Sequence, residues 1–118
     1  MHILQKKEFK VFNTKYDVAF GEEPLKLENG DYEYGICHSA GTNISVSQND
    51  IDKKPLDKQD YEKNAMHEIV HAILGEGGYI NTSDDEPLVE WLARCMYDIV
   101  VNQDFFELRD ECKREKRI

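Results

Sequence analysis

Residues 57–74 read DKQDYEKNAMHEIVHAIL and carry a clear helical pattern. Apolar side chains recur there at intervals of three and four, the spacing that places them on one face of an α-helix. These positions are Tyr61, Ala65, Met66, Ile69, Val70, Ile73 and Leu74. Asp57 suits the N-cap of this helix, and Gly75, followed by Gly77 and Gly78, is typical of its end. We therefore expect a helix over residues 57–74 whose apolar face packs against the rest of the fold.

The centre of this helix carries the motif H-E-x-x-H, formed by His67, Glu68 and His71. Histidines four positions apart are separated by about 40° around a helix, so both imidazoles can reach one ion. Glu68 lies about 100° from His67, where its carboxylate can address a water on that ion. The pattern predicts one Zn²⁺ bound by His67 and His71, with Glu68 as the catalytic residue. The alternative is a surface pair of histidines with a neighbouring glutamate.

Two histidines leave a catalytic zinc one protein ligand short, because such sites have three protein ligands and a water. No histidine follows His71, which excludes the metallopeptidases whose third ligand is a histidine six residues further on. A carboxylate or a cysteine must then complete the site, and Glu86 and Glu90 on the next predicted helix are the candidates. Their spacing of four places them on one helix face, so that one can bind the metal while the other orients a ligand histidine. In the alternative, Glu86 closes a capping box with Ser83, and Glu90 is an ordinary exposed acid.

The first half of the chain is predicted to be β-structure, because apolar segments alternate there with turn signals. The expected strands cover residues 9–12, 16–20, 32–37 and 42–47. Asn13 and Thr14 form the break expected of a hairpin between the first two. Residues 42–47 alternate polar and apolar side chains strictly, so one face of that strand should be buried. After the first helix we expect a polar loop over residues 81–85, a second helix over 86–101 and a shorter helix over 104–116.

The composition is that of a globular protein, with 40% hydrophobic and 33% charged residues among 118. We expect a single domain over residues 1–118, of the α+β class. No apolar run approaches the roughly 20 residues of a membrane span, and the N-terminal residues lack the apolar core of a signal peptide. A cytoplasmic protein that does not contact membranes is therefore expected. The net charge of −9 disfavours general nucleic-acid binding.

Three cysteines, Cys37, Cys95 and Cys112, form no C-x-x-C pair, so neither a zinc ribbon nor a thioredoxin-like site is predicted. We expect reduced thiols. Four cations within residues 113–117 are interpreted as a solvated helix end that complements the helix dipole; the alternative is an interaction tail.

Together, the H-E-x-x-H motif and the two acids that follow it resemble the thermolysin-like (gluzincin) metallopeptidases. In that group a helix bearing E-x-x-x-D follows the H-E-x-x-H helix. The resemblance implies that Glu86 is the third zinc ligand and that Glu90, a glutamate where the family has aspartate, supports a histidine. Within the group, the chain is most similar to the minimal ImmA/IrrE-type metallopeptidases and to short H-E-x-x-H proteins of phages and mobile elements. The similarity spans about residues 34–99, and it includes no separate DNA-binding or substrate-recruiting domain.

The sequence thus predicts a small antiparallel or mixed sheet packed on the H-E-x-x-H helix and on a second, ligand-bearing helix, a minimal zincin-like arrangement. The expected reaction is hydrolysis of a peptide bond in a specific protein partner, which the resemblance suggests is a phage or mobile-element regulatory protein. The strand over residues 42–47 is a candidate sheet edge for an extended substrate. Tyr79, His38 and Tyr97 are candidate donors to the transition state. The alternatives are a non-catalytic, zinc-stabilised binding module and an acidic mimic of nucleic acid.

Overall fold

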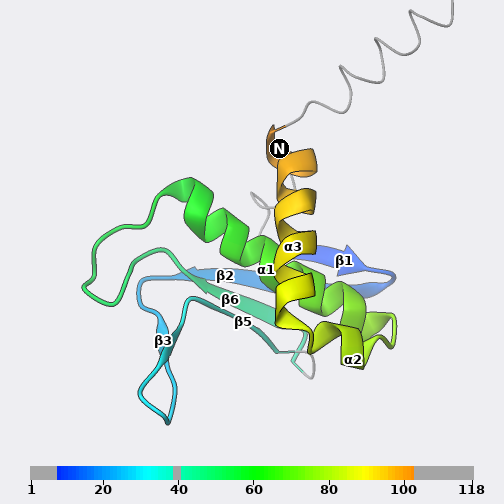
Figure 1. Cartoon of the computed structure of the whole chain (residues 1–118), viewed down its shortest axis with the longest axis horizontal. Coiled ribbons are helices and arrows are strands. Elements are labelled where there is room, and N and C mark those ends of the chain that lie inside the picture. The colour runs from blue at the N-terminus through cyan, green and yellow to red at the C-terminus, as the bar shows by residue number, and fades with distance from the viewer. Residues whose placement is uncertain (1–7, 39–40, 103–118) are drawn as a thin grey trace, which may run out of the picture.

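The computed structural model describes residues 8–38 and 41–102, and four of its strands form one mixed sheet (Figure 1). The order across the sheet is β1 (Glu8–Val11), β2 (Thr14–Gly21), β6 (Asn43–Ser47) and β5 (Gly35–His38). The outer pairs β1–β2 and β5–β6 are antiparallel, whereas β2 and β6 are parallel. A separate two-stranded hairpin, β3 (Leu25–Lys26) and β4 (Tyr32–Glu33), projects from the end of β2. The α+β class and a mixed sheet are therefore confirmed.

Strand β6 lies inside the sheet, and the prediction that it forms the sheet edge is wrong. It pairs with β2 on one side and with β5 on the other. The predicted alternation is confirmed over residues 43–46, because Ile44 and Val46 are buried while Asn43 and Ser45 are exposed; it ends at Ser47, which is also buried. Alternation reports which face of a strand is buried, but it does not report how many neighbours the strand has. The edge nearest the helical site is β5.

The long helix α1 (Lys58–Glu76) packs across the sheet and carries α3 (Glu86–Tyr97) on its other side (Figure 1). The sheet contributes Phe9, Val11, Tyr16, Ile44 and Val46 to the core, and α1 contributes Ala65, Met66, Ile69, Val70 and Ala72. Helix α3 adds Val89, Ala93 and Tyr97, which recur every four residues and so form one buried stripe. One core thus joins the sheet to α1 and α1 to α3.

Helix α1 begins as predicted, with Asp57 at the N-cap position, although the Asp57 side chain makes no capping hydrogen bond. It ends later than predicted, at Glu76, with Gly77 as the C-cap. The two extra residues are held by β2, because the Tyr16 hydroxyl donates to Glu76 Oε1 at 2.6 Å and the Thr14 hydroxyl donates to Glu76 Oε2 at 3.1 Å. These contacts join residues 60 or more positions apart, so no local pattern could indicate them.

Several other boundaries differ from the predictions. The first hairpin turns at Phe12 and Asn13, since Val11 pairs with Thr14 and Phe12 takes a positive φ of 56°. The strand predicted over residues 32–37 is split between β4 and β5, which belong to different sheets. The predicted polar loop contains a short helix, α2 (Ile80–Ser83), and the second long helix ends at Tyr97 in a π-helical turn, η2 (Asp98–Asn102).

The helix predicted over residues 104–116, together with Cys112 and the cations of residues 113–117, lies outside the described residues. Among the described residues, neither Cys37 nor Cys95 forms a disulfide bond. None of the described helices is both long and apolar enough to cross a membrane.

Candidate metal centre

Three side chains from α1 and α3 converge on one point. His67 Nε2 lies 2.9 Å from Glu86 Oε2, His71 Nε2 lies 3.2 Å from Glu86 Oε1, and the two Nε2 atoms are 3.2 Å apart. Each of the three residues offers one ligand atom, and these three atoms all lie within 4.8 Å of one another. The cluster of His67, His71 and Glu86 could therefore hold a metal ion. Two imidazole nitrogens with one carboxylate form a donor set that suits catalytic zinc.

The position of Glu86 depends on how α3 begins. Asp85 is the N-cap residue, and its Oδ1 accepts a hydrogen bond from the Leu88 backbone N–H at 3.2 Å. Pro87 occupies the first turn, where its missing N–H costs no hydrogen bond. The helix therefore starts with Glu86 in the turn that faces α1. The alternative capping box between Ser83 and Glu86 is not formed, because Asp85 takes the N-cap position and Ser83 belongs to α2.

A second layer of contacts orients both histidines. His67 Nδ1 lies 2.7 Å from Glu90 Oε2, and Glu90 Oε1 accepts a hydrogen bond from Arg94 Nε at 3.2 Å. Burial acts to raise the pKa of Glu90, but hydrogen bonds from His67 and Arg94 bring that pKa below its ordinary value. An ionised Glu90 holds the proton of His67 on Nδ1 and so leaves Nε2 as the ligand atom. This is the role expected for Glu90 as the supporting acid.

His71 is oriented by Ser83, for which the sequence pattern indicates only a possible capping role. Ser83 Oγ lies 2.9 Å from His71 Nδ1. The hydroxyl oxygen can accept a hydrogen bond from the Nδ1–H group, and His71 then presents Nε2 to the same point as His67. A serine near the end of a short helix is a common feature, so the sequence spacing between His71 and Ser83 does not indicate this contact.

Replacing Ser83 by alanine should weaken zinc binding by about 10–100-fold, the range typical when such an outer partner of a metal ligand is lost. The ligand set itself stays intact, so zinc should still bind in a ratio of one per chain. Competition titration with a chromophoric chelator measures the affinity. Thr82→Ala, on the same short helix, is the matched control and should leave it unchanged. Equal affinity for the Ser83→Ala variant and the wild type would show that Ser83 does not orient His71.

Glu68 is buried against the first residue of β5. Only 7% of its surface is exposed, and a Cβ at position 35 would lie 3.1 Å from Glu68 Cγ. Glycine at position 35 therefore gives the Glu68 side chain its space beside the strand. Burial is the largest cause that raises the pKa of Glu68 to about 7; the nearby charges of Glu86 and Glu33 act in the same direction, and His67 opposes the shift. A carboxyl group with such a pKa can both accept and donate a proton near neutral pH.

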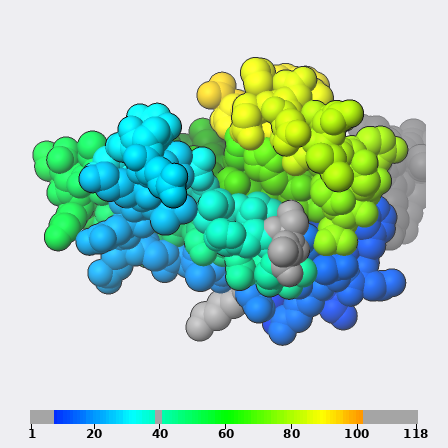
Figure 2. Space-filling view, turned by 90° about the horizontal axis from the view of Figure 1, so that it is seen from below, coloured from blue at the N-terminus to red at the C-terminus, as the bar shows by residue number. Residues whose placement is uncertain are grey.

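An open cavity of about 500 Å³ gives access to these groups. Its walls include the three residues of the metal cluster and Glu68, together with Glu33, Tyr34, Gly35, Asn64 and Glu90. Figure 2 shows this face, with α1 (green) at the floor between the β3–β4 hairpin (cyan) and α3 (yellow). Tyr34 and Asn64 were missed by the sequence analysis, because neither belongs to the motif and only the fold brings the hairpin to α1.

The predicted transition-state donors do not line this cavity. Tyr79 is 63% exposed and lies near Gly77 at the end of α1. His38 is exposed at the far end of β5 from Gly35. Tyr97 is buried three turns along α3 from Glu86, where it lines a neighbouring cavity. Among the described residues of the cavity, Tyr34 and Asn64 are polar groups that can donate hydrogen bonds to a substrate.

No family model, no curated protein and no solved structure matches this chain. Its function is therefore inferred from the residues of the site and from the fold that places them.

Proposed function

We propose that the protein is a zinc-dependent metallopeptidase that cleaves a peptide bond in a partner protein. The convergence of His67 Nε2, His71 Nε2 and the Glu86 carboxylate at 2.9–3.2 Å is the observation that carries this proposal. The donor set fits zinc, and the outer contacts leave both Nε2 atoms available as ligands. The packing of a mixed sheet, the H-E-x-x-H helix and a ligand-bearing helix also supports a minimal zincin-like fold of the gluzincin type.

His67, His71 and Glu86 would hold the zinc ion, which would act as a Lewis acid toward the attacking water and the scissile carbonyl. Glu68 accepts a proton from the attacking water and later donates it to the leaving amine. Its burial beside Gly35 fixes the carboxyl group at the cavity wall. Asn64, one turn before Glu68 on α1, is placed to donate a hydrogen bond to a substrate carbonyl.

The free edge of β5 supports binding of an extended substrate. Among the described residues, β5 pairs with β6 on one side only, so its other side offers backbone N–H and C=O groups. An added peptide strand would run past Gly35, which lies against Glu68. This assignment replaces the expectation that β6 forms the substrate-binding edge.

A non-catalytic, zinc-stabilised binding module is the second candidate function. The same ligand cluster and the same open edge serve that function equally well. Glu68 favours the enzyme, because a structural metal site does not need a buried carboxyl group that opens onto the cavity. Burying a carboxyl group costs stability, and catalysis gives a reason for that cost.

Zinc content and zinc-dependent cleavage test the proposal directly. The purified protein should bind about one zinc per chain, measured by elemental analysis. Mild acid should release the metal, because protons compete for the two imidazoles. Candidate partner proteins, including phage and mobile-element regulators, should be cleaved with zinc present, remain intact with a chelator, and be cleaved again when zinc is restored. A protein that takes up no zinc at neutral pH contradicts the proposal.

A further inference from the structure

The cavity at the metal cluster is lined by four carboxylates, of which only that of Glu33 has no role in the proposed function. Glu86 belongs to the metal cluster, Glu90 supports a ligand histidine, and Glu68 is the proposed general base. Among the described residues, no lysine or arginine lines this cavity. Glu33 therefore adds a negative charge that no lysine or arginine of the cavity wall balances.

The β3–β4 hairpin keeps its own lysine away from Glu33. Across the hairpin, Glu33 pairs with Leu25, whereas Lys26 pairs with Tyr32. Residues directly opposite each other share one face of a hairpin and their neighbours share the other, so Lys26 lies on the face that does not carry Glu33. The ion pairs found among the described residues accordingly include none with Glu33.

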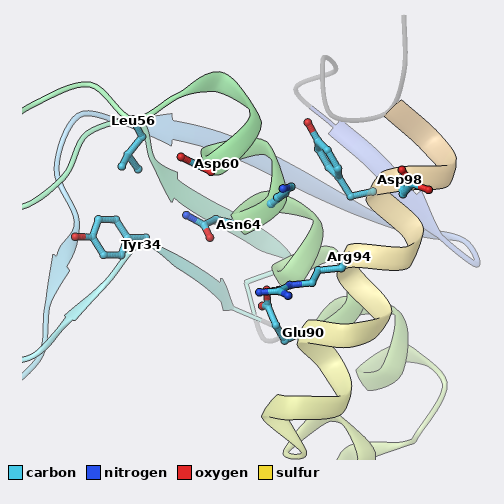
Figure 3. Close-up of a pocket in the computed structure, with 9 residues that line it drawn as sticks. Tyr34, Leu56, Asp60, Asn64, Glu90, Arg94 and Asp98 are labelled. Carbon is cyan, nitrogen blue, oxygen red and sulfur yellow. The ribbon is translucent and has the colours of Figure 1, made fainter. Parts of the chain in front are cut away.

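The two cations of the neighbouring cavity are engaged with groups other than the hairpin. That cavity encloses about 630 Å³ between α1 and α3 and adjoins the metal cavity. Arg94 Nε donates to Glu90 Oε1 at 3.2 Å, and Figure 3 shows this pair on α3 with Tyr34 on the opposite side of the cavity. Lys63 lies over the Tyr97 ring, with its Nζ 5.7 Å from the ring centroid.

A small cavity of about 70 Å³ lies beside Glu33 on the hairpin side of the metal cavity. It shares with the metal cavity three consecutive residues, Glu33, Tyr34 and Gly35. Leu25, which is 46% exposed, lines it together with Glu33, and its other acid, Glu23, lies 3.9 Å from Lys53 Nζ. An apolar side chain next to a carboxylate matches lysine or arginine, whose stem is apolar and whose end is charged.

Glu33 also lies beside the edge on which an extended substrate is proposed to bind. Gly35, the first residue of β5, lies against Glu68, and two residues of chain span at most about 7 Å. A peptide paired with β5 at Gly35 therefore brings a residue close to its scissile bond within reach of Glu33. The net charge of −9 favours the approach of basic peptides in general.

We propose that Glu33 and Leu25 form a subsite for a cationic group of the substrate close to the scissile bond. The assignment as a substrate subsite rests on the proposed function. Two sources share this chemistry, namely a lysine or arginine side chain within the partner protein and a free N-terminal amine. The Leu25 side chain favours the first source, because it can pack against the aliphatic stem of a long basic side chain.

The test is peptide binding by the zinc-loaded Glu68→Gln protein, measured by fluorescence anisotropy. One pair of short peptides, blocked at both ends, carries lysine or methionine at its centre. A second pair has methionine at its centre and a free or an acetylated N-terminus. At least one cationic peptide should bind about three- to tenfold more tightly than its neutral match, and added salt should reduce the difference because Glu33 is exposed. The responsive pair identifies the source of the charge.

Variants assign the preference to the subsite. Glu33→Gln should remove most of the difference within the responsive peptide pair, and Glu33→Lys should reverse it. Glu28→Gln is the matched control, because Glu28 is an exposed acid in the turn of the same hairpin and lies outside both cavity walls. It changes the net charge by the same amount as Glu33→Gln and should keep the difference, which separates a local subsite from the general field of an acidic protein. Zinc content is measured for each variant, and binding is compared only at full occupancy.

Equal binding within both peptide pairs, an undiminished difference in the Glu33→Gln variant, or no binding of any peptide overturns the proposed subsite. The same peptides are incubated with the wild-type protein, so the subsite and the enzyme are judged separately. Cleavage without a preference for cationic peptides contradicts the subsite and leaves the peptidase standing. A preference that depends on Glu33, without cleavage of any peptide or partner, supports the subsite and contradicts the peptidase.

Discussion

Replacing Glu68 by glutamine is expected to lower the rate of peptide cleavage by a factor of about 10²–10⁴, the usual contribution of a general base. A neutral amide cannot accept a proton from the attacking water. The zinc content should stay at that of the wild type, because Glu68 is not among the residues that form the metal cluster. The fold should also persist, since glutamine fits the same buried space beside Gly35 and has a similar helix propensity.

Thermal unfolding and elemental analysis confirm that the variant is intact before cleavage is measured. Glu22→Gln, the same substitution at an exposed position in the loop after β2, is the matched control and should cleave like the wild type. Cleavage is best measured on candidate partner proteins, because a substrate that pairs with the β5 edge must present an extended segment. If the Glu68→Gln variant and the wild type act alike on every partner, Glu68 is not a catalyst. The protein is then a binding module.

The part of the site that lies on helices could be predicted from the sequence, because helical spacing fixes which side chains share a face. His67 and His71 are four residues apart, as are Glu86 and Glu90, and the structure brings all four together. Only the choice between Glu86 and Glu90 as the ligand required the family resemblance. The geometry agrees with that choice, since Glu86 reaches both Nε2 atoms whereas Glu90 reaches Nδ1 of His67.

The parts that could not be predicted depend on contacts between distant segments. The place of β6 within the sheet follows from its parallel pairing with β2, which lies more than 20 residues earlier in the chain. Tyr34 reaches the cavity because the chain leaves the β3–β4 hairpin beside α1, and no periodicity marks such a position. Ser83 reaches His71 through a four-residue helix that is too short to leave a helical pattern in the sequence.

The zinc affinities of two variants should distinguish the roles of Glu86 and Glu90 on α3. Glu86→Gln removes the ligand carboxylate and should weaken zinc binding more strongly than any outer-contact variant. Glu90→Gln keeps the ligand set and removes only the charged partner of His67 Nδ1, so a loss of about 10–100-fold is expected. Both substitutions keep the size of the side chain, and both residues are exposed on the same helix. A difference in affinity therefore reports the role of each carboxylate in the site.

Zinc affinity is measured for both variants and for the wild type under one set of conditions. The metal-free proteins are compared by thermal unfolding, because Glu86 also lies in the first turn of α3, where a negative charge stabilises the helix. Losing that charge should lower the free energy of unfolding by about 0.3–1 kcal/mol. This change is too small to unfold a domain and too small to account for loss of the metal. A larger loss of zinc from Glu90→Gln than from Glu86→Gln would place the ligand one turn further along α3. His67 would then bind through Nδ1, and Arg94 would contact the ligand carboxylate itself.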